Sequence, residues 1–140
     1  MGRQRKAYRL LPLLLAMGAL FYQSHQPGDS FTLPDVDNID KLFHCLAYAV
    51  LGLAFLFALS PQWRRQHPAL AGWATVSFCL LYGITDEFHQ SFIPGRFAGL
   101  DDVLADAAGG VLAVAGYWGW RRWRTIMKDR GESHEPSRPG

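Results

Sequence analysis

Hydrophobic residues are concentrated in four long segments of this 140-residue chain, and charged residues are nearly absent from those segments. The segments are Leu10–Tyr22, Leu42–Ser60, Ala69–Thr85 and Val103–Trp120. A helix needs about 20 apolar residues to cross the roughly 30 Å of hydrocarbon in a bilayer, and about 17 is the lower limit. The second and fourth segments meet this limit, the third meets it narrowly, and the first requires Ala7, Tyr8 and Gln23 as well.

We therefore predict an all-α integral membrane protein, a bundle of four transmembrane helices at about residues 7–23, 41–60, 69–92 and 101–123. Residues 1–127 are expected to form this membrane domain, and the polar, Gly- and Pro-rich residues 128–140 a disordered cytoplasmic tail. The first segment also has features of a cleaved signal peptide, since basic residues precede a short apolar stretch. No small residues suited to cleavage follow it at Tyr22 to His25, so a retained helix is favoured.

The basic residues predict the orientation of this bundle. Of the 14 Lys and Arg residues, only Lys41 and Arg96 lie outside the N-terminal segment, the 61–68 connection and the C-terminal segment. Cytoplasmic loops of membrane proteins carry an excess of Lys and Arg. Both termini and the 61–68 connection, which reads as a tight turn, are therefore predicted to be cytoplasmic. The predicted location is the plasma (inner) membrane, with several passes through it.

Polar residues near the outer ends of the second, third and fourth predicted helices fall on one face of each helix. At about 100° per residue, each set occupies a stripe of about 80° to 100°. The stripes contain Lys41, His44, Tyr48 and Gly52; Thr75, Cys79, Tyr82, Asp86, His89 and Gln90, with Glu87 at the flank; and Asp102, Asp106, Gly109, Ala113 and Gly116. Small residues mark faces where membrane helices approach closely, so the acids of the fourth helix are predicted to point into the bundle. The three stripes can then converge in one outward-facing pocket.

Two stretches, DKLFHCLAYAVLG and DEFHQSFIPGRFAGLDDVLADAAGGVLA, hold most of these polar residues. In them the chain resembles the VanZ-like family of small multi-pass membrane proteins, named for an accessory protein of glycopeptide-resistance clusters, over roughly residues 37–116. The matching positions are Asp40, Lys41, His44, Tyr48, Asp86, Glu87, His89, Gln90, Pro94, Gly95, Arg96, Asp102 and Gly109. Where the family pattern usually has Asn, this chain has Asp106, which adds a potential negative charge. The resemblance implies a plasma-membrane location and, in the named member, reduced susceptibility to teicoplanin, but no established reaction.

We expect the pocket to bind an anionic amphiphile, such as a lipid-linked cell-wall precursor or a lipoglycopeptide, and to lower glycopeptide susceptibility by doing so. Lys41 and Arg96 would hold the anionic head group, since Arg suits bidentate recognition of phosphate or carboxylate. The predicted ligand-binding residues are Lys41, His44, Tyr48, Tyr82, Asp86, Glu87, His89, Gln90, Arg96, Asp102 and Asp106. Structural roles, in a turn or in helix packing, are expected for Pro94, Gly95 and Gly109.

Three other interpretations of the polar residues remain open. A membrane-embedded enzyme acting on a lipid-linked substrate is one, because His44, His89 and the acids supply enough N and O donors for a divalent metal or for acid–base chemistry. No spacing matches a known metal or catalytic signature, so neither an enzyme nor a cofactor is favoured. A purely structural polar clasp and a proton or ion pathway are the other two. The expected partners are membrane lipids or a lipid-linked envelope ligand and not nucleic acid, while homo-oligomerisation stays open.

Overall fold

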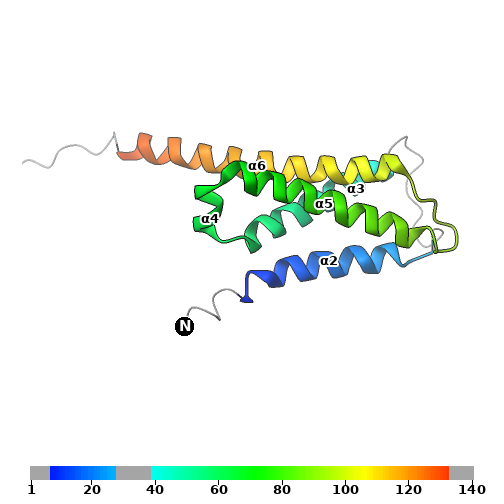
Figure 1. Cartoon of the computed structure of the whole chain (residues 1–140). Helices are drawn as coiled ribbons and strands as arrows, with labels where there is room; N and C mark the ends of the chain where they lie inside the picture. The colour runs from blue at the N-terminus through cyan, green and yellow to red at the C-terminus, as the bar shows by residue number, and fades with distance from the viewer. Residues whose placement is uncertain (1–6, 28–38, 133–140) are drawn as a thin grey trace, which may run out of the picture.

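Four long helices and one short helix make up the part of the chain that the computed structural model describes, residues 7–27 and 39–132. The helices are α2 (Leu10–Ser24), α3 (Ile39–Ala58), α4 (Pro61–Gln66), α5 (Pro68–Gln90) and α6 (Leu100–Glu132). Figure 1 shows the long helices side by side, with the short α4 joining α3 to α5 at one end of the bundle. α2 and α6 each pack against both α3 and α5. The prediction of an all-α fold is confirmed.

Two of these helices, α3 and α5, are long and apolar enough to cross a membrane, with mean hydropathies of 1.8 and 1.3. Only 28% of the apolar stretch of each is buried inside the bundle, whereas the core helix of a soluble protein is mostly buried. α2 is apolar but has 15 residues. Large apolar side chains are exposed on all four long helices, for example Leu14, Leu46, Leu81 and Leu104. A surface of this kind marks contact with a membrane or with another protein.

The structure corrects two details of the predicted helix boundaries. Residues 61–68, expected to form a tight turn, contain α4, whose first turn is capped because the Ser60 hydroxyl accepts a hydrogen bond from Trp63 N–H at 3.3 Å. α6 continues to Glu132 and does not end near residue 123. Residues 128–132, predicted to belong to a disordered tail, are therefore helical, while residues 133–140 lie outside the described part. Arg124 stacks over Trp120 one turn earlier, at 5.0 Å from the ring centroid, which favours continuation of the helix.

Glycines allow α6 to approach its neighbours closely. A Cβ added at Gly109 would overlap the carbonyl oxygen of Cys45 in α3, and one added at Gly110 would lie 3.0 Å from the Cβ of Cys79 in α5. Gly109 thus lies at a tight helix contact, as its place in the small-residue stripe suggested. Gly116 belongs to the same stripe but has nothing within 4 Å, so the close contact ends before that residue.

Candidate functional site

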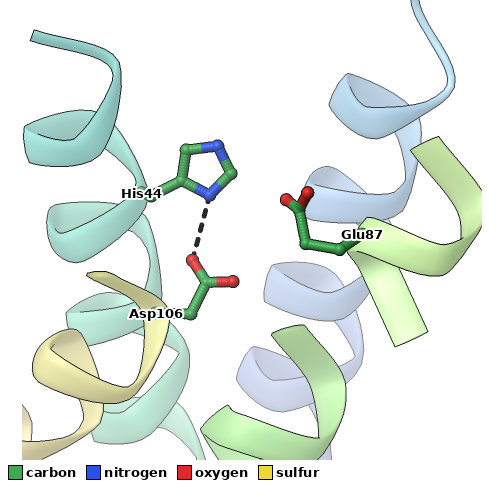
Figure 2. A group of neighbouring side chains, drawn as sticks. All are labelled: His44, Glu87 and Asp106. Carbon is green, nitrogen blue, oxygen red and sulfur yellow. Dashed lines mark hydrogen bonds and ion pairs between the residues drawn. The ribbon is translucent and has the colours of Figure 1, made fainter. Parts of the chain in front are cut away.

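Three ionisable side chains from three helices meet at the end of the bundle opposite α4. His44 comes from the beginning of α3, Glu87 from the last turn of α5 and Asp106 from the beginning of α6. Figure 2 shows their polar ends turned toward one another. One ligand atom of each residue lies within 4.8 Å of those of the other two. Asp106 is fully buried and Glu87 is 5% exposed, so the cluster lies inside the protein rather than on its surface.

The hydrogen bonds of this cluster leave two carboxylate oxygens without a partner. His44 Nδ1 lies 3.0 Å from Asp106 Oδ1, and Gly99 N–H donates to Glu87 Oε2 at 2.9 Å. Glu87 Oε1 and Asp106 Oδ2 are buried and accept no hydrogen bond from residues 7–27 or 39–132. Leaving a buried acceptor unsatisfied costs about 1–3 kcal/mol, and more for a charged group. A cation between the carboxylates would satisfy both oxygens.

Local sequence explains how Asp106 fits between the helices. Gly83 lies one turn before Glu87 on α5, directly opposite Asp106. A Cβ added at Gly83 would lie 2.5 Å from Asp106 Oδ2 and 3.0 Å from Asp106 Cβ. Any side chain at position 83 would therefore push the carboxylate out of place. Sequence reasoning missed Gly83, although a glycine one turn before an acid in an apolar helix was a usable signal.

Lys41 forms an ion-pair network at the rim of this end. Its Nζ lies 2.8 Å from Asp40 Oδ2, 2.9 Å from Asp101 Oδ2 and 3.6 Å from Asp102 Oδ1. The network joins the beginning of α3 to the beginning of α6. Three carboxylates therefore already surround the ammonium group of Lys41.

Arg96 holds the end of α2. Its Nε donates to the carbonyl oxygen of Gln26 at 3.1 Å, and its Nη2 donates to that of Gln23 at 3.0 Å. A guanidinium at a helix C-terminus satisfies free carbonyls and interacts favourably with the helix dipole. The turn before it contains Pro94 and Gly95, and Gly95 has a φ of 74°, a left-handed conformation that favours glycine. Within the described residues, Arg96 forms no ion pair with a carboxylate.

A small cavity lies between α2, α3 and α5 beside the cluster. Its lining residues are Leu20, Gln23, Ser24, Phe43, His44, Ala47, Tyr48, Asp86, Gln90 and Arg96. Gln90 Nε2 donates to Asp86 Oδ2 at 3.0 Å, and the Tyr48 hydroxyl is buried without a partner. The cavity volume is about 20 Å³, which is room for about one water molecule. The head group of a large amphiphile does not fit into this space.

Two further predicted residues face α2. The Tyr82 hydroxyl donates to the carbonyl oxygen of Met17 at 2.7 Å. His89 Nε2 lies 3.2 Å from His25 Nδ1, with the two rings stacked at 5.4 Å between centroids and Phe21 beside both. His25 is exposed and was not among the predicted site residues. The apolar pattern of α2 carries no polar stripe, so only the position of His25 directly after that helix pointed to this pair.

The cluster is chemically suited to two tasks. One nitrogen and two carboxylate oxygens form a donor set that suits a divalent cation such as Zn²⁺ or Mn²⁺. The His44–Asp106 pair also resembles the arrangement in which a carboxylate orients an imidazole for proton transfer. The second ring nitrogen of His44 points away from Asp106 (Figure 2) and is the one that would exchange a proton with a ligand.

Comparison with known protein families places the chain. A protein-family model described as VanZ/LLP1 matches residues 3–123, which include α2 to α5, most of α6 and the whole cluster. Curated proteins give no match, and solved structures give none.

Proposed function

Since the chain belongs to the VanZ/LLP1 family, we propose that it is a multi-pass plasma-membrane protein that binds an anionic amphiphile through a divalent cation. His44, Glu87 and Asp106 hold the cation, and the cation contacts the anionic group. The amphiphile is a lipid-linked envelope precursor or a lipoglycopeptide, and lower glycopeptide susceptibility is the proposed consequence.

Four membrane-crossing helices with both termini in the cytoplasm are part of this proposal. The hydropathies of α3 and α5 support two of the crossings. The exposed apolar side chains of α2 and α6, such as Leu15 and Leu112, support the other two. Basic residues at the α4 end support a cytoplasmic position for that end. The cluster would then lie near the outer surface, where a lipid-linked precursor or a glycopeptide is found.

The two unpartnered oxygens, Glu87 Oε1 and Asp106 Oδ2, are the observation that carries the proposal. In a tetrahedral site whose ligands lie about 2.1 Å from the ion, neighbouring ligand atoms are about 3.4 Å apart. The three ligand atoms lie within 4.8 Å of one another, so side-chain rotations that bring them closer would close the site around an ion. Three protein ligands also leave a coordination position open for a ligand oxygen.

The cation takes the role that the sequence suggested for Lys41 and Arg96. Three carboxylates already neutralise Lys41, and Arg96 is bonded to two carbonyls of α2. Neither is free to neutralise an anionic head group. Because the adjoining cavity holds about one water molecule, only a small group such as a phosphate oxygen would reach the cluster, while the rest of the amphiphile stays in the membrane.

Hydrolysis of a lipid-linked phosphate ester or anhydride is a second candidate function. The contact between His44 Nδ1 and Asp106 Oδ1 favours it, because it leaves the other nitrogen of His44 available to take a proton from water. Water would form the new P–O bond, the bond to the leaving oxygen would break, and the proton would pass to the leaving group. Release of phosphate from a lipid-linked pyrophosphate by the purified protein would support hydrolysis over simple binding.

Equilibrium dialysis of the purified full chain against Mn²⁺ and Zn²⁺ tests the cation site. We expect one ion per chain, and at least about tenfold weaker binding in Glu87→Gln, since metal affinity depends on charged ligands. Asp86→Asn is the matched control because Asp86 is also buried on α5 but is bonded to Gln90. No bound ion, or equal affinities in Glu87→Gln and the unaltered chain, would contradict the proposal.

A further inference from the structure

Arg64, at the opposite end of the bundle from the cluster, is a buried cation that forms no ion pair with any described residue. It lies on α4 and is 7% exposed, and its Nε is buried with no hydrogen-bond partner. Its guanidinium carbon lies 5.0 Å from the ring centroid of Tyr117 on α6. No carboxylate in the described part of the chain forms an ion pair with it. A buried charge normally has a partner, so this side chain calls for one.

The surroundings of Arg64 are also positively charged. Burial lowers the pKa of the Arg64 guanidinium, and the charges of Arg9, Arg121 and Arg65 act in the same direction, while Tyr117 opposes them. Arg9 directly precedes α2 and Arg121 lies on α6, so charges from two other helices act on the Arg64 guanidinium. They stay protonated at neutral pH. Their mutual repulsion would be relieved by an anion.

An apolar groove between α3 and α6 begins at this place. It is lined by Leu46, Ala49, Leu53, Leu112, Ala113, Gly116, Tyr117 and Trp120 and has a volume of about 560 Å³. Tyr117 is shared between the two features, because its ring lines the groove and contacts the guanidinium of Arg64. The positively charged site around Arg64 therefore adjoins the apolar groove on the outside of the bundle.

We propose that Arg64, with Arg9, Arg65 and Arg121, binds the head group of an anionic phospholipid whose acyl chain lies in the α3–α6 groove. α4 joins the two helices best suited to cross a membrane, so it lies at a membrane surface in either orientation of the chain. Basic pockets between helices at such a surface bind anionic head groups, and Arg holds phosphate oxygens in pairs. This inference does not depend on the cation site at the other end of the bundle.

Thermal unfolding of the detergent-solubilised full chain, with added phosphatidylglycerol or phosphatidylcholine, tests the site. Phosphatidylglycerol should raise Tm by about 3–6 °C and phosphatidylcholine should not, since a ligand that binds only the folded state stabilises it. Arg64→Gln should abolish this rise. Arg64→Lys keeps the charge but loses the planar fork, and should retain less than about half of the rise. Arg122→Gln is the control, since this substitution removes one positive charge from an exposed position on α6.

Three outcomes would overturn the inference. Equal losses in Arg64→Gln and Arg122→Gln would mean diffuse attraction between charges and not a built site. An equal rise with inorganic phosphate would mean that the acyl chain contributes nothing. A full rise in Arg64→Lys would mean that charge alone is recognised, and this variant decides the matter if Arg64→Gln does not fold.

Discussion

The two ends of the bundle handle buried charge in opposite ways. At the end with His44, Glu87 and Asp106, carboxylates lie between the helices; Gly83 makes room for Asp106, and Gly109 lets α6 approach the backbone of α3. At the end with Arg64, long guanidiniums lie against aromatic rings, such as that of Tyr117, outside the close helix contacts. The side chain that carries a carboxylate is short, so the backbone must place the carboxylate next to its ligand. A guanidinium reaches its ligand through a flexible stem, so the backbone around it needs less accuracy.

This contrast predicts that a glycine substitution is most damaging at the acidic end. Gly83→Ala should lower the free energy of unfolding by about 2 kcal/mol, since its Cβ would overlap the Asp106 carboxylate. It should also weaken Mn²⁺ or Zn²⁺ binding at least as much as Glu87→Gln does. Unfolding in detergent and equilibrium dialysis measure the two effects.

The control for Gly83→Ala is Gly119→Ala on α6, where an added Cβ would have no described neighbour within 4 Å. It should raise stability by as much as about 1 kcal/mol, because alanine is the better helix former. Equal effects of the two substitutions would show that Asp106 is not held in place by close packing.

The effect of Glu87→Gln on stability should reverse when the divalent cation is added. Without the cation, this substitution removes the charge of a buried carboxylate whose Oε1 has no hydrogen-bond partner among the described residues. It should therefore raise the free energy of unfolding by about 1.5 kcal/mol. The amide oxygen can still accept the hydrogen bond from Gly99. With a saturating cation, the unaltered chain should become the more stable of the two. Thermal unfolding of both proteins with and without Mn²⁺ measures this, and the same ranking in both conditions would contradict a cation role for Glu87.

The positions of α3 and α5 could be predicted to within two residues at each end, because charge-poor runs bounded by polar or Pro-containing segments define them. Helical phase also placed Asp106 toward the bundle interior, where it is fully buried. The length of α6 could not be predicted in this way, because polar residues after residue 123 carry no membrane signal. Cap and stacking contacts support α4 and the end of α6, and hydropathy does not detect such contacts.

It was harder to predict which atoms the site residues contact than to predict which face of a helix they lie on. A stripe on a helical wheel shows which side chains point inward, but not which atoms they reach. Arg96 bonds to carbonyl oxygens at the end of α2, and backbone acceptors leave no trace in a side-chain pattern. His89 likewise pairs with His25 beyond the last turn of α2. Helix α2 closes one side of the cavity through residues that include Gln23 and Ser24, two polar positions at its end that were not assigned to the site from the sequence.

A substitution at Lys41 tests whether the ion pairs at the rim of the acidic end contribute to divalent binding in its interior. Lys41→Gln should lower Tm by a few degrees at low salt, because it leaves the carboxylates of Asp101 and Asp102 facing one another without a cation. Ion pairs that are accessible to solvent are screened by salt. The difference in Tm should therefore shrink as NaCl is added, and divalent binding at the cluster should stay unchanged. A loss of divalent binding would mean that the rim and the interior form one site.

The smallest expected effect is at Tyr117, under the Arg64 guanidinium. Tyr117→Leu should lower the free energy of unfolding by about 0.5–1 kcal/mol, since it replaces the ring in a cation–π contact, whereas Tyr117→Phe keeps the ring and should stay close to the unaltered chain. Thermal unfolding of the two variants in the same detergent measures the difference. A loss in Tyr117→Phe as large as that in Tyr117→Leu would mean that the hydroxyl, and not the ring face, holds the guanidinium. The arginine end would then need the same accuracy of hydrogen-bond geometry as the acidic end, and the contrast between the two ends would fail.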